Sequence, residues 1–374
     1  LLNGQTRLHS TKDAYPLSYS ILNDYALQLS APDTKSDCGI FACAYADTLQ
    51  ASSLVPDMLR CPVDYLKARY HTTDGGGDGG GIIVQSSPNV LANFYGCEER
   101  FFKGEGRLVQ VSFSRDKHVR SGQEFELKSR LNELGAAIIV QKTPETNFDC
   151  LRDGKNNEKD RQGQLVHFVI EKPMGVSNEL FDQKCLQLIL QFNLHQKSVD
   201  CVQDGYSPAS IDAITKQRIV CKSFKGDSIV EMFPFLKSLK TNNLRFHGRE
   251  ATNTGAARFS IHPTADMNIM HNGEINNIKS LRIYLSGNQL FRDFLNWQGQ
   301  ASLEDVLNQF SDTAIFSMYL SFQFCNGISI EDTLCHSFQP NHISYTKGFV
   351  AEGPATIMVS HANEFFLVND SQGQ

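Results

Sequence analysis

Short apolar runs rich in β-branched and aromatic residues recur along the chain and predict β-strands. Eight runs of this kind occur: Gly39–Ala44, Ile82–Gln85, Leu108–Phe113, Ala137–Gln141, Leu165–Ile170, Arg218–Lys222, Ala355–Val359 and Phe365–Val368. Longer stretches with apolar residues at helical spacing predict helices at Ser121–Leu134, Glu179–Gln196, Asp227–Leu239, Ile275–Trp297 and Ser302–Cys325. Strands dominate the first 170 residues and helices gather later. This order favours one large α+β domain, with helices packed on antiparallel sheets, over a regular βαβ repeat.

Several local signals refine this pattern. Ser121-Gly-Gln-Glu124 has the form of a capping box, which predicts that a helix begins there. Ser311-Asp312 is expected to interrupt the last helical stretch. Three segments predict loops: the glycine-rich Thr72–Gly81, the polar Cys150–Gln164, and His247–Gly255.

The charge balance and the composition exclude two classes of partner. The chain has 374 residues, with 35 Lys and Arg against 41 Asp and Glu, so its net charge is −6. There is no basic excess to contact nucleic-acid phosphates, and there is no run of about 20 apolar residues to span a bilayer. We therefore predict neither a nucleic-acid partner nor a membrane partner.

The cysteines and the first segment indicate the cellular context. The ten cysteines are scattered and form no Cys-x-x-Cys pair. This pattern predicts no metal site and favours reduced thiols in the cytoplasm. The first residue is Leu1 rather than Met, and the first 37 residues lack the cationic and apolar regions of a signal peptide. We expect a fragment or a processed chain.

The glycine-rich run before the second predicted strand is a candidate nucleotide site. A phosphate-binding loop needs a Lys and a Ser or Thr after its last glycine, whereas Gly81 is followed by Ile82 and Ile83. A dinucleotide-binding loop leads into a helix, whereas this run leads into a predicted strand. We therefore interpret the glycines as a tight turn in which backbones approach closely.

The segment His271–Asn276 (HNGEIN) is a candidate for transition-state stabilisation. The Asn272 amide and the Gly273 N–H could converge on one point and form an oxyanion hole. Taken alone, however, an Asn-Gly pair is more often a plain turn.

Three further segments offer groups that bind a substrate or attack it. Arg249, with Thr252 three residues later, suits the bidentate capture of a carboxylate. Asp312 is either a helix cap or a carboxylate for a substrate ammonium. Cys38 stands at the head of a predicted strand, where a cysteine alone is usually a buried core thiol. Cationic, amide and anionic groups together would suit a zwitterionic amino acid with a reacting amide.

These segments, in this order, resemble the class II glutamine amidotransferases, and most closely the glutaminase domain of the glutamate synthase large subunit. The blocks that resemble the family are CGIFACA, GGGDGGGIIVQ, HGREATNT, HNGEIN and SDTA. A weaker similarity is EGPATI (Glu352–Ile357), which resembles a segment near the end of the family's domain. The resemblance implies a four-layer αββα sandwich of the N-terminal-nucleophile hydrolase type, with two antiparallel sheets flanked by helices. It also implies a leader or propeptide over residues 1–37 and an amidotransferase domain over residues 38–374, truncated at its C-terminal end.

The resemblance assigns the catalytic groups. Cys38 would be the nucleophile, made N-terminal by removal of the leader, and its own α-amino group would be the general base. Asn272 and the Gly273 N–H would form the oxyanion hole. The reaction would attack the side-chain amide of L-glutamine, release ammonia and hydrolyse a thioester to glutamate.

The resemblance also assigns substrate binding. Arg249 and Thr252 would bind the α-carboxylate of glutamine, and Asp312 would hold its α-ammonium. The block departs from the family at Glu250, which places an anion beside the proposed carboxylate receptor. Arg258 is a rival for the arginine, but it lacks the Thr-Asn-Thr that follows Arg249 closely.

The resemblance further implies an ammonia-accepting synthase partner or domain, similar to glutamate synthase. FMN and an iron–sulfur cluster are expected only in such a separate synthase domain, and this chain is expected to need no cofactor. Two alternatives stay open. One is a catalytically dead or regulatory domain of the same fold, and the other is a different N-terminal-Cys amide hydrolase.

Overall fold

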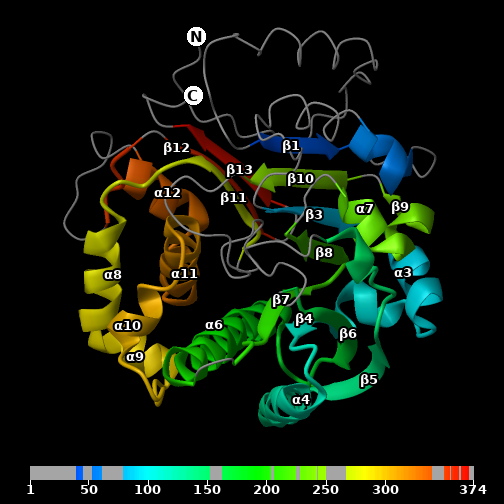
Figure 1. Ribbon diagram of the computed structural model, residues 1–374, viewed down its shortest axis with the longest axis horizontal. Coiled ribbons are helices and arrows are strands. Elements are labelled where there is room, and N and C mark those ends of the chain that lie inside the picture. Colours follow the sequence, from blue (N-terminus) through cyan, green and yellow to red (C-terminus); the bar gives the residue numbers. More distant parts are fainter. Residues whose placement is uncertain are drawn as a thin grey trace, which may run out of the picture.

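The computed structural model describes residues 39–44, 53–60, 79–151, 162–203, 206–224, 228–241, 243–249, 267–338, 349–353, 355–361 and 364–369. A first sheet, called here the β1 sheet, has four antiparallel strands, in the order β1 (Gly39–Ala44), β10 (Asn243–Arg249), β3 (Gly79–Gln85) and β8 (Arg218–Ser223). Figure 1 shows that this sheet joins segments that are far apart in the sequence.

A second sheet, the β11 sheet, lies beside the first. Its antiparallel strands follow the order β11 (Ile269–Gly273), β12 (Ala355–His361) and β13 (Glu364–Asn369). Helix α11 (Asp312–Cys325) contacts β11, and α12 (Ile330–Phe338) contacts β13. Three shorter helices complete this helical layer: α8 (Ile278–Gly287), α9 (Gln289–Leu295) and α10 (Leu303–Leu307).

A third sheet, the β4 sheet, extends the molecule beyond the β1 sheet. Its order is β5 (Ala137–Lys142), β6 (Gln164–Glu171), β4 (Gly106–Phe113) and β7 (Ser210–Thr215), and β7 lies next to β8 (Figure 1). Helix α6 (Asn178–Val202) packs on β7, and α4 (Lys117–Glu133) packs on β4. The remaining elements are short: β2 (Ser53–Leu54), β9 (Lys240–Thr241), α3 (Pro88–Tyr95), α7 (Ile229–Met232), η1 (Phe101–Glu105), η2 (Phe148–Cys150) and η4 (Pro234–Ser238).

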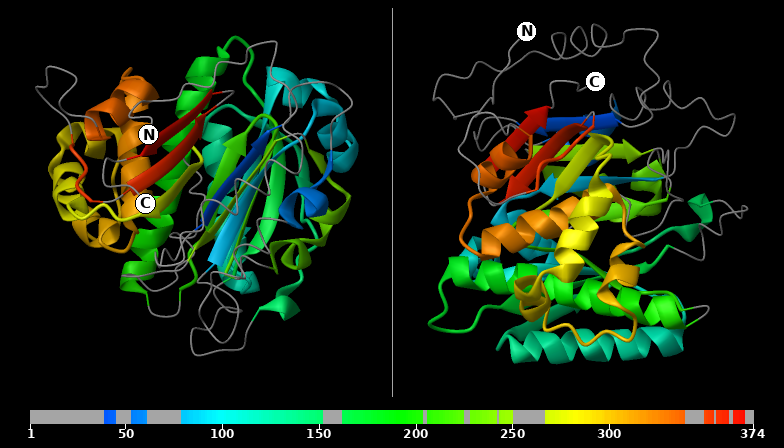
Figure 2. Two further views of the ribbon diagram at one scale, coloured as in Figure 1. Left: turned by 90° about the horizontal axis from the view of Figure 1, so that it is seen from above. Right: turned by 90° about the vertical axis from the view of Figure 1, so that its left-hand side faces the viewer.

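The layers are seen from above in the left panel of Figure 2. Helices α11 and α12 cover the β11 sheet, which faces the β1 sheet through a contact between β11 and β1. Helix α7 contacts β3 and β8 on the far side of the β1 sheet, and α3 shares the same apolar core. The predicted αββα arrangement of two antiparallel sheets between helices is confirmed.

The β1 sheet is apolar on one side and polar on the other. Ile82, Val84, Leu244 and Phe246 pack with α3 and α7 in one core cluster. Because side chains alternate along a strand, their neighbours face the β11 sheet, as the hydrogen bond from Arg245 to Ser360 Oγ on β12 demonstrates. We call these buried residues the polar layer: Arg218, Lys222, Arg245 and His247.

All eight predicted strands are present, with ends shifted by a few residues. Five strands were not predicted: β2, β7, β9, β10 and β11. The prediction of a loop at residues 247–255 is wrong for its first part, because His247, Gly248 and Arg249 complete strand β10. Strand β10 was missed because its inward side chains belong to the polar layer.

The helix predictions needed more correction. Helix α4 begins earlier than predicted, because Asp116 caps it by accepting hydrogen bonds from His118 N and Val119 N, at 2.8 and 3.0 Å. Ser121 lies inside this helix, so the predicted capping box is wrong. Residues 275–297 form two helices, and Asn288 caps the second.

The remaining differences concern breaks and loops. Pro234 divides residues 227–239 into α7 and the 3-10 helix η4. The break at Ser311-Asp312 is confirmed, because Ser311 caps α11. The predicted loop Thr72–Gly81 is wrong for Gly79–Gly81, which begin β3, while residues 72–78 lie outside the described part. Helices α3 and α12 were not predicted.

Candidate active site

Strand β11 ends at the two predicted oxyanion-hole residues. Asn272 is half-buried and pairs with Thr356 on β12, and the exposed Gly273 pairs with Ala355. Gly273 has φ +115°, a backbone conformation that a residue with a side chain rarely adopts. The backbone conformation with which the chain leaves the sheet at Gly273 therefore requires glycine. Asn272 is the residue before it, at the end of β11.

The loop after Gly273 is attached to the first turn of helix α11. The N–H of Ile275 donates to Asp312 Oδ2 at 3.1 Å, and the N–H of Thr313 donates to Asp312 Oδ1 at 2.8 Å. Ser311, the N-cap of α11, accepts a hydrogen bond from Ala314 N at 3.3 Å. One carboxylate thus joins the loop to the helix, and the helix start is fixed by its own cap.

A buried histidine supports the same junction. His271 Nδ1 lies 2.8 Å from Thr313 Oγ1 and 3.7 Å from Asp312 Oδ2. Burial lowers the pKa of His271, and the nearby carboxylates of Asp312 and Glu274 only partly oppose this shift. His271 is therefore neutral near pH 7, and it holds β11 against α11 rather than carrying a charge.

A second segment, residues 349–353, closes over the loop. Asn276 N donates to Glu352 O at 2.7 Å, and Glu352 N donates to Asn277 Oδ1 at 3.1 Å. A Cβ on Gly353, which has φ +121°, would lie 2.5 Å from Glu274 O. Position 353 must therefore be glycine for the two segments to pack.

The starts of β1 and β3 and the end of β10 meet at one edge of the β1 sheet. Gly39, the residue after Cys38, pairs with Gly248, and Arg249 pairs with Gly79. Strand β1 also contacts β11. At this edge, therefore, β1 begins directly after Cys38 and β10 ends with the backbone of Arg249.

The predicted site residues divide into two groups. Asn272, Gly273 and Asp312 lie on adjoining elements, as described above. Cys38 and Thr252 lie outside the described residues, and for Arg249 only the backbone position is described. The roles assigned to all six residues stay predictions.

The sequence did not reveal the residues that support the loop. His271 and Thr313 flank the predicted residues Asn272 and Asp312, but no spacing rule connects a strand end with a helix start 42 positions away. Gly353 did give a signal, because Glu-Gly-Pro directly precedes a predicted strand and resembles a family block.

The described residues contain neither a candidate metal site nor a candidate membrane span. No group of three or more His, Cys, Asp or Glu side chains among them lies close enough together to hold a metal ion. In the same part of the chain, no helix is both long enough and apolar enough to cross a membrane.

The sequence matches the family model of the class II glutamine amidotransferases over residues 38–342. This match covers most of the chain, and the fold described above is that of the N-terminal-nucleophile hydrolases. The chain therefore belongs to the class II glutamine amidotransferases. A search of curated proteins found no significant match.

Proposed function

We propose that the chain is a glutaminase domain that begins, in its active form, at Cys38. It hydrolyses the side-chain amide of L-glutamine and delivers ammonia to a synthase domain or partner similar to glutamate synthase. The observation that supports this proposal best is the position of Asn272 and Gly273, at the end of the strand that contacts β1. The family match also begins at residue 38.

In the proposed reaction, the free α-amino group of Cys38 accepts the thiol proton. An α-amine has a pKa near 8, which suits this role close to neutral pH. The thiolate attacks the amide carbon, and Asn272 and the Gly273 N–H stabilise the oxyanion. The C–N bond breaks with the proton returned to the leaving nitrogen, ammonia departs, and water then hydrolyses the thioester to glutamate.

Substrate binding follows from opposite charges. Arg249, with Thr252, pairs with the α-carboxylate of glutamine, and Asp312 accepts hydrogen bonds from its α-ammonium. Asp312 also accepts the Ile275 and Thr313 N–H groups, so it would link substrate binding to the position of the loop. A carboxylate has about four acceptor sites. The two N–H groups and the Thr313 hydroxyl, which donates to Oδ1 at 3.4 Å, use three of them.

Purified protein beginning at Cys38 should release ammonia from glutamine. We expect Cys38→Ala to abolish this release and Cys201→Ala, which removes an exposed cysteine, to leave it unchanged. Chain that retains residues 1–37 should be inactive, and equal turnover with the leader present would refute the free-amine mechanism.

The same assay distinguishes the alternatives. If folded protein beginning at Cys38 releases no ammonia from any amide, the domain is catalytically dead. If it hydrolyses asparagine or simple amides as well as glutamine, it is a different N-terminal-Cys amide hydrolase.

A further inference from the structure

A cavity of about 320 Å³ lies at the end of the β1 sheet remote from Gly39. Strand β3 connects the two ends, because Gly79 pairs with Arg249 at one end and Gln85 lines the cavity at the other. Six residue steps along a strand span about 20 Å. The cavity is therefore separate from the proposed glutaminase site.

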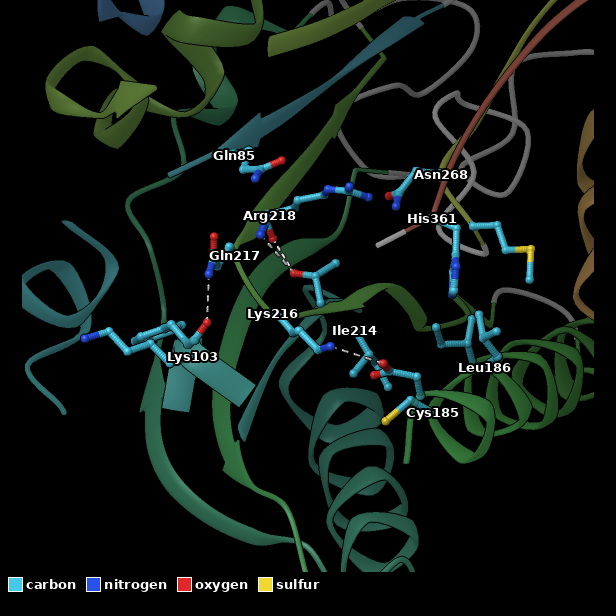
Figure 3. Close-up of a pocket in the computed structure, with 15 residues that line it drawn as sticks. Gln85, Lys103, Cys185, Leu186, Ile214, Lys216, Gln217, Arg218, Asn268 and His361 are labelled. Carbon is cyan, nitrogen blue, oxygen red and sulfur yellow. Dashed lines mark hydrogen bonds and ion pairs between the residues drawn. The ribbon is translucent and has the colours of Figure 1, made fainter. Parts of the chain in front are cut away.

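The side chain of Arg218 extends into this cavity between Gln85 and Asn268 (Figure 3). Arg218 is only 6 % exposed, and its backbone oxygen and nitrogen form the hydrogen bonds to Gln110 and Thr215. Among the described residues, its guanidinium has no hydrogen-bond or ion-pair partner. A buried cation without a partner is costly, so this group indicates a missing anion.

The other charges that line the cavity are compensated. Asp182 lies 2.6 Å from Arg107 and 3.5 Å from Lys216. Lys103 lies 2.6 Å from Glu99. The carboxylate in the wall therefore has two cations of its own and cannot neutralise Arg218 as well.

A second cation increases the local positive potential. Arg245 lies on β10, which β3 separates from the strand of Arg218. It is 5 % exposed, and it donates to the hydroxyl of Ser360 rather than to a carboxylate. Burial lowers the pKa of Arg218 to about 10, and burial together with the charge of Arg218 lowers the pKa of Arg245 to about 9. Both side chains remain cationic near pH 7, so the charge of Arg245 adds to the positive potential that would favour an anion at Arg218.

The opposite wall of the cavity offers an unused hydrogen-bond acceptor. Asn268 Oδ1 is buried and has no partner within the described structure. Met267 and Asn268 both have positive φ, at 51° and 48°, and Ser360 N holds this turn by donating to Met267 O at 3.2 Å. Such a backbone conformation is uncommon for a residue like Met and occurs often at ligand sites.

One part of the wall is apolar, and Met267, Leu186 and Ile189 line it. We propose that this cavity binds a small organic carboxylate, which forms a two-pronged ion pair with Arg218 and lays its chain against these three residues. A guanidinium beside an apolar wall suits a carboxylate with a carbon chain better than a hydrated inorganic anion. This proposal does not depend on the glutaminase activity.

The test uses three probes on the whole chain. Valerate has a carboxylate and an apolar chain, valeramide has the same shape without the charge, and sulfate has charge without the chain. We expect a seven-atom ligand to bind in the millimolar range, well short of the ceiling for small ligands, so ligand-detected NMR titration is the suitable measurement. We expect valerate to bind at least tenfold more tightly than valeramide or sulfate.

Variants locate the binding. Loss of a charge-assisted pair corresponds to about a tenfold to hundredfold rise in Kd, which we expect for Arg218→Gln. Gln217→Glu is a second variant, because Gln217 is half-buried in the wall and a carboxylate there would repel an anionic probe. Arg120→Gln on the surface of α4 and Arg249→Ala at the glutaminase site are matched controls that should bind valerate normally.

Each outcome is decisive. Tighter binding of valerate that is lost in Gln217→Glu and in folded Arg218→Gln supports the site. The proposal is overturned if no probe binds, if sulfate binds as well as valerate, or if folded Gln217→Glu binds valerate like the unmodified chain. Loss of binding in Arg249→Ala would place the carboxylate at the glutaminase site instead and would also overturn the proposal.

Discussion

Asp312 is the residue whose replacement tests the site geometry most directly. Its carboxylate accepts hydrogen bonds from Ile275 N in the loop after Gly273 and from Thr313 N in the first turn of α11. In Asp312→Asn, one of the two oxygens becomes an NH2 group. An amide group can keep one of these hydrogen bonds but not both.

The magnitude follows from burial and charge. Ile275 is 3 % exposed, and leaving a buried N–H without an acceptor costs about 1–3 kcal/mol. Loss of the negative charge at a helix N-terminus adds about 0.3–1 kcal/mol. Because the Asp312 side chain itself is 26 % exposed, water can partly replace the lost acceptor, and we expect the unfolding free energy to fall by about 1–2 kcal/mol.

Urea unfolding of Asp312→Asn measures this loss, and Asp332→Asn is the matched control. Asp332 also lies in the first turn of a helix, but it is exposed and accepts a hydrogen bond from Ser329 Oγ rather than from a buried amide. We expect the control to lose less than about 1 kcal/mol. Equal losses in the two variants would refute the attachment of the loop by Asp312. The KM for glutamine should rise in Asp312→Asn, and an unchanged KM would refute the ammonium contact.

Three further predictions concern catalysis, substrate binding and pH. Asn272→Ala should lower kcat per folded molecule about a hundredfold to a thousandfold with little change in KM, and unchanged turnover would leave Asn272-Gly273 as a plain turn. Arg249→Ala should raise the KM for glutamine about tenfold to a hundredfold, whereas a larger effect of Arg258→Ala would show that the wrong arginine was chosen. Burial lowers the pKa of His167 from 6.5 to about 3. Between these two pH values, therefore, only the unfolded chain binds a proton at this histidine, and the unfolding free energy falls as the pH falls. His167→Gln should flatten this slope by at most about 1.4 kcal/mol per pH unit in urea titrations, and an unchanged slope would contradict a neutral buried His167.

The strands that the sequence predicted are those with apolar residues on both sides or a long apolar run. Strand β4, for example, is buried along its whole length and was predicted within two residues of its start. Strand β10 was missed because Arg245 and His247 interrupt its apolar residues. Propensity could not reveal that these two polar side chains are buried between sheets, because that depends on the partner sheet.

The start of a helix was predicted correctly where only one nearby side chain can act as the N-cap. Ser311 was identified correctly, since it caps α11 through Ala314 N. Ser121 was not, because Asp116 lies five residues earlier and accepts two backbone N–H groups. A carboxylate at the N-cap also interacts favourably with the helix dipole, so the longer helix is the more stable one.

For the site, the sequence identified the segments but not their supports. Asn272 and Asp312 were selected by resemblance, and the structure brings their elements together through Ile275. The contribution of residues 349–353 could not be predicted, because Glu352 and Gly353 act through backbone atoms whose partners are set only by the fold.

The polar layer between the two sheets connects these observations. Arg218 and Arg245 have no carboxylate partner among the described residues, and burying them in this way lowers the stability of the empty protein. A purely structural interface would favour apolar side chains there. Asn268 beside the cavity directly precedes strand β11, which ends at Asn272 and Gly273 at the proposed glutaminase site. A bound anion at Arg218 would remove part of that cost and would fix the turn from which β11 begins. The most economical explanation of an arginine-lined interior in this fold is therefore that ligands, rather than protein side chains, complete it.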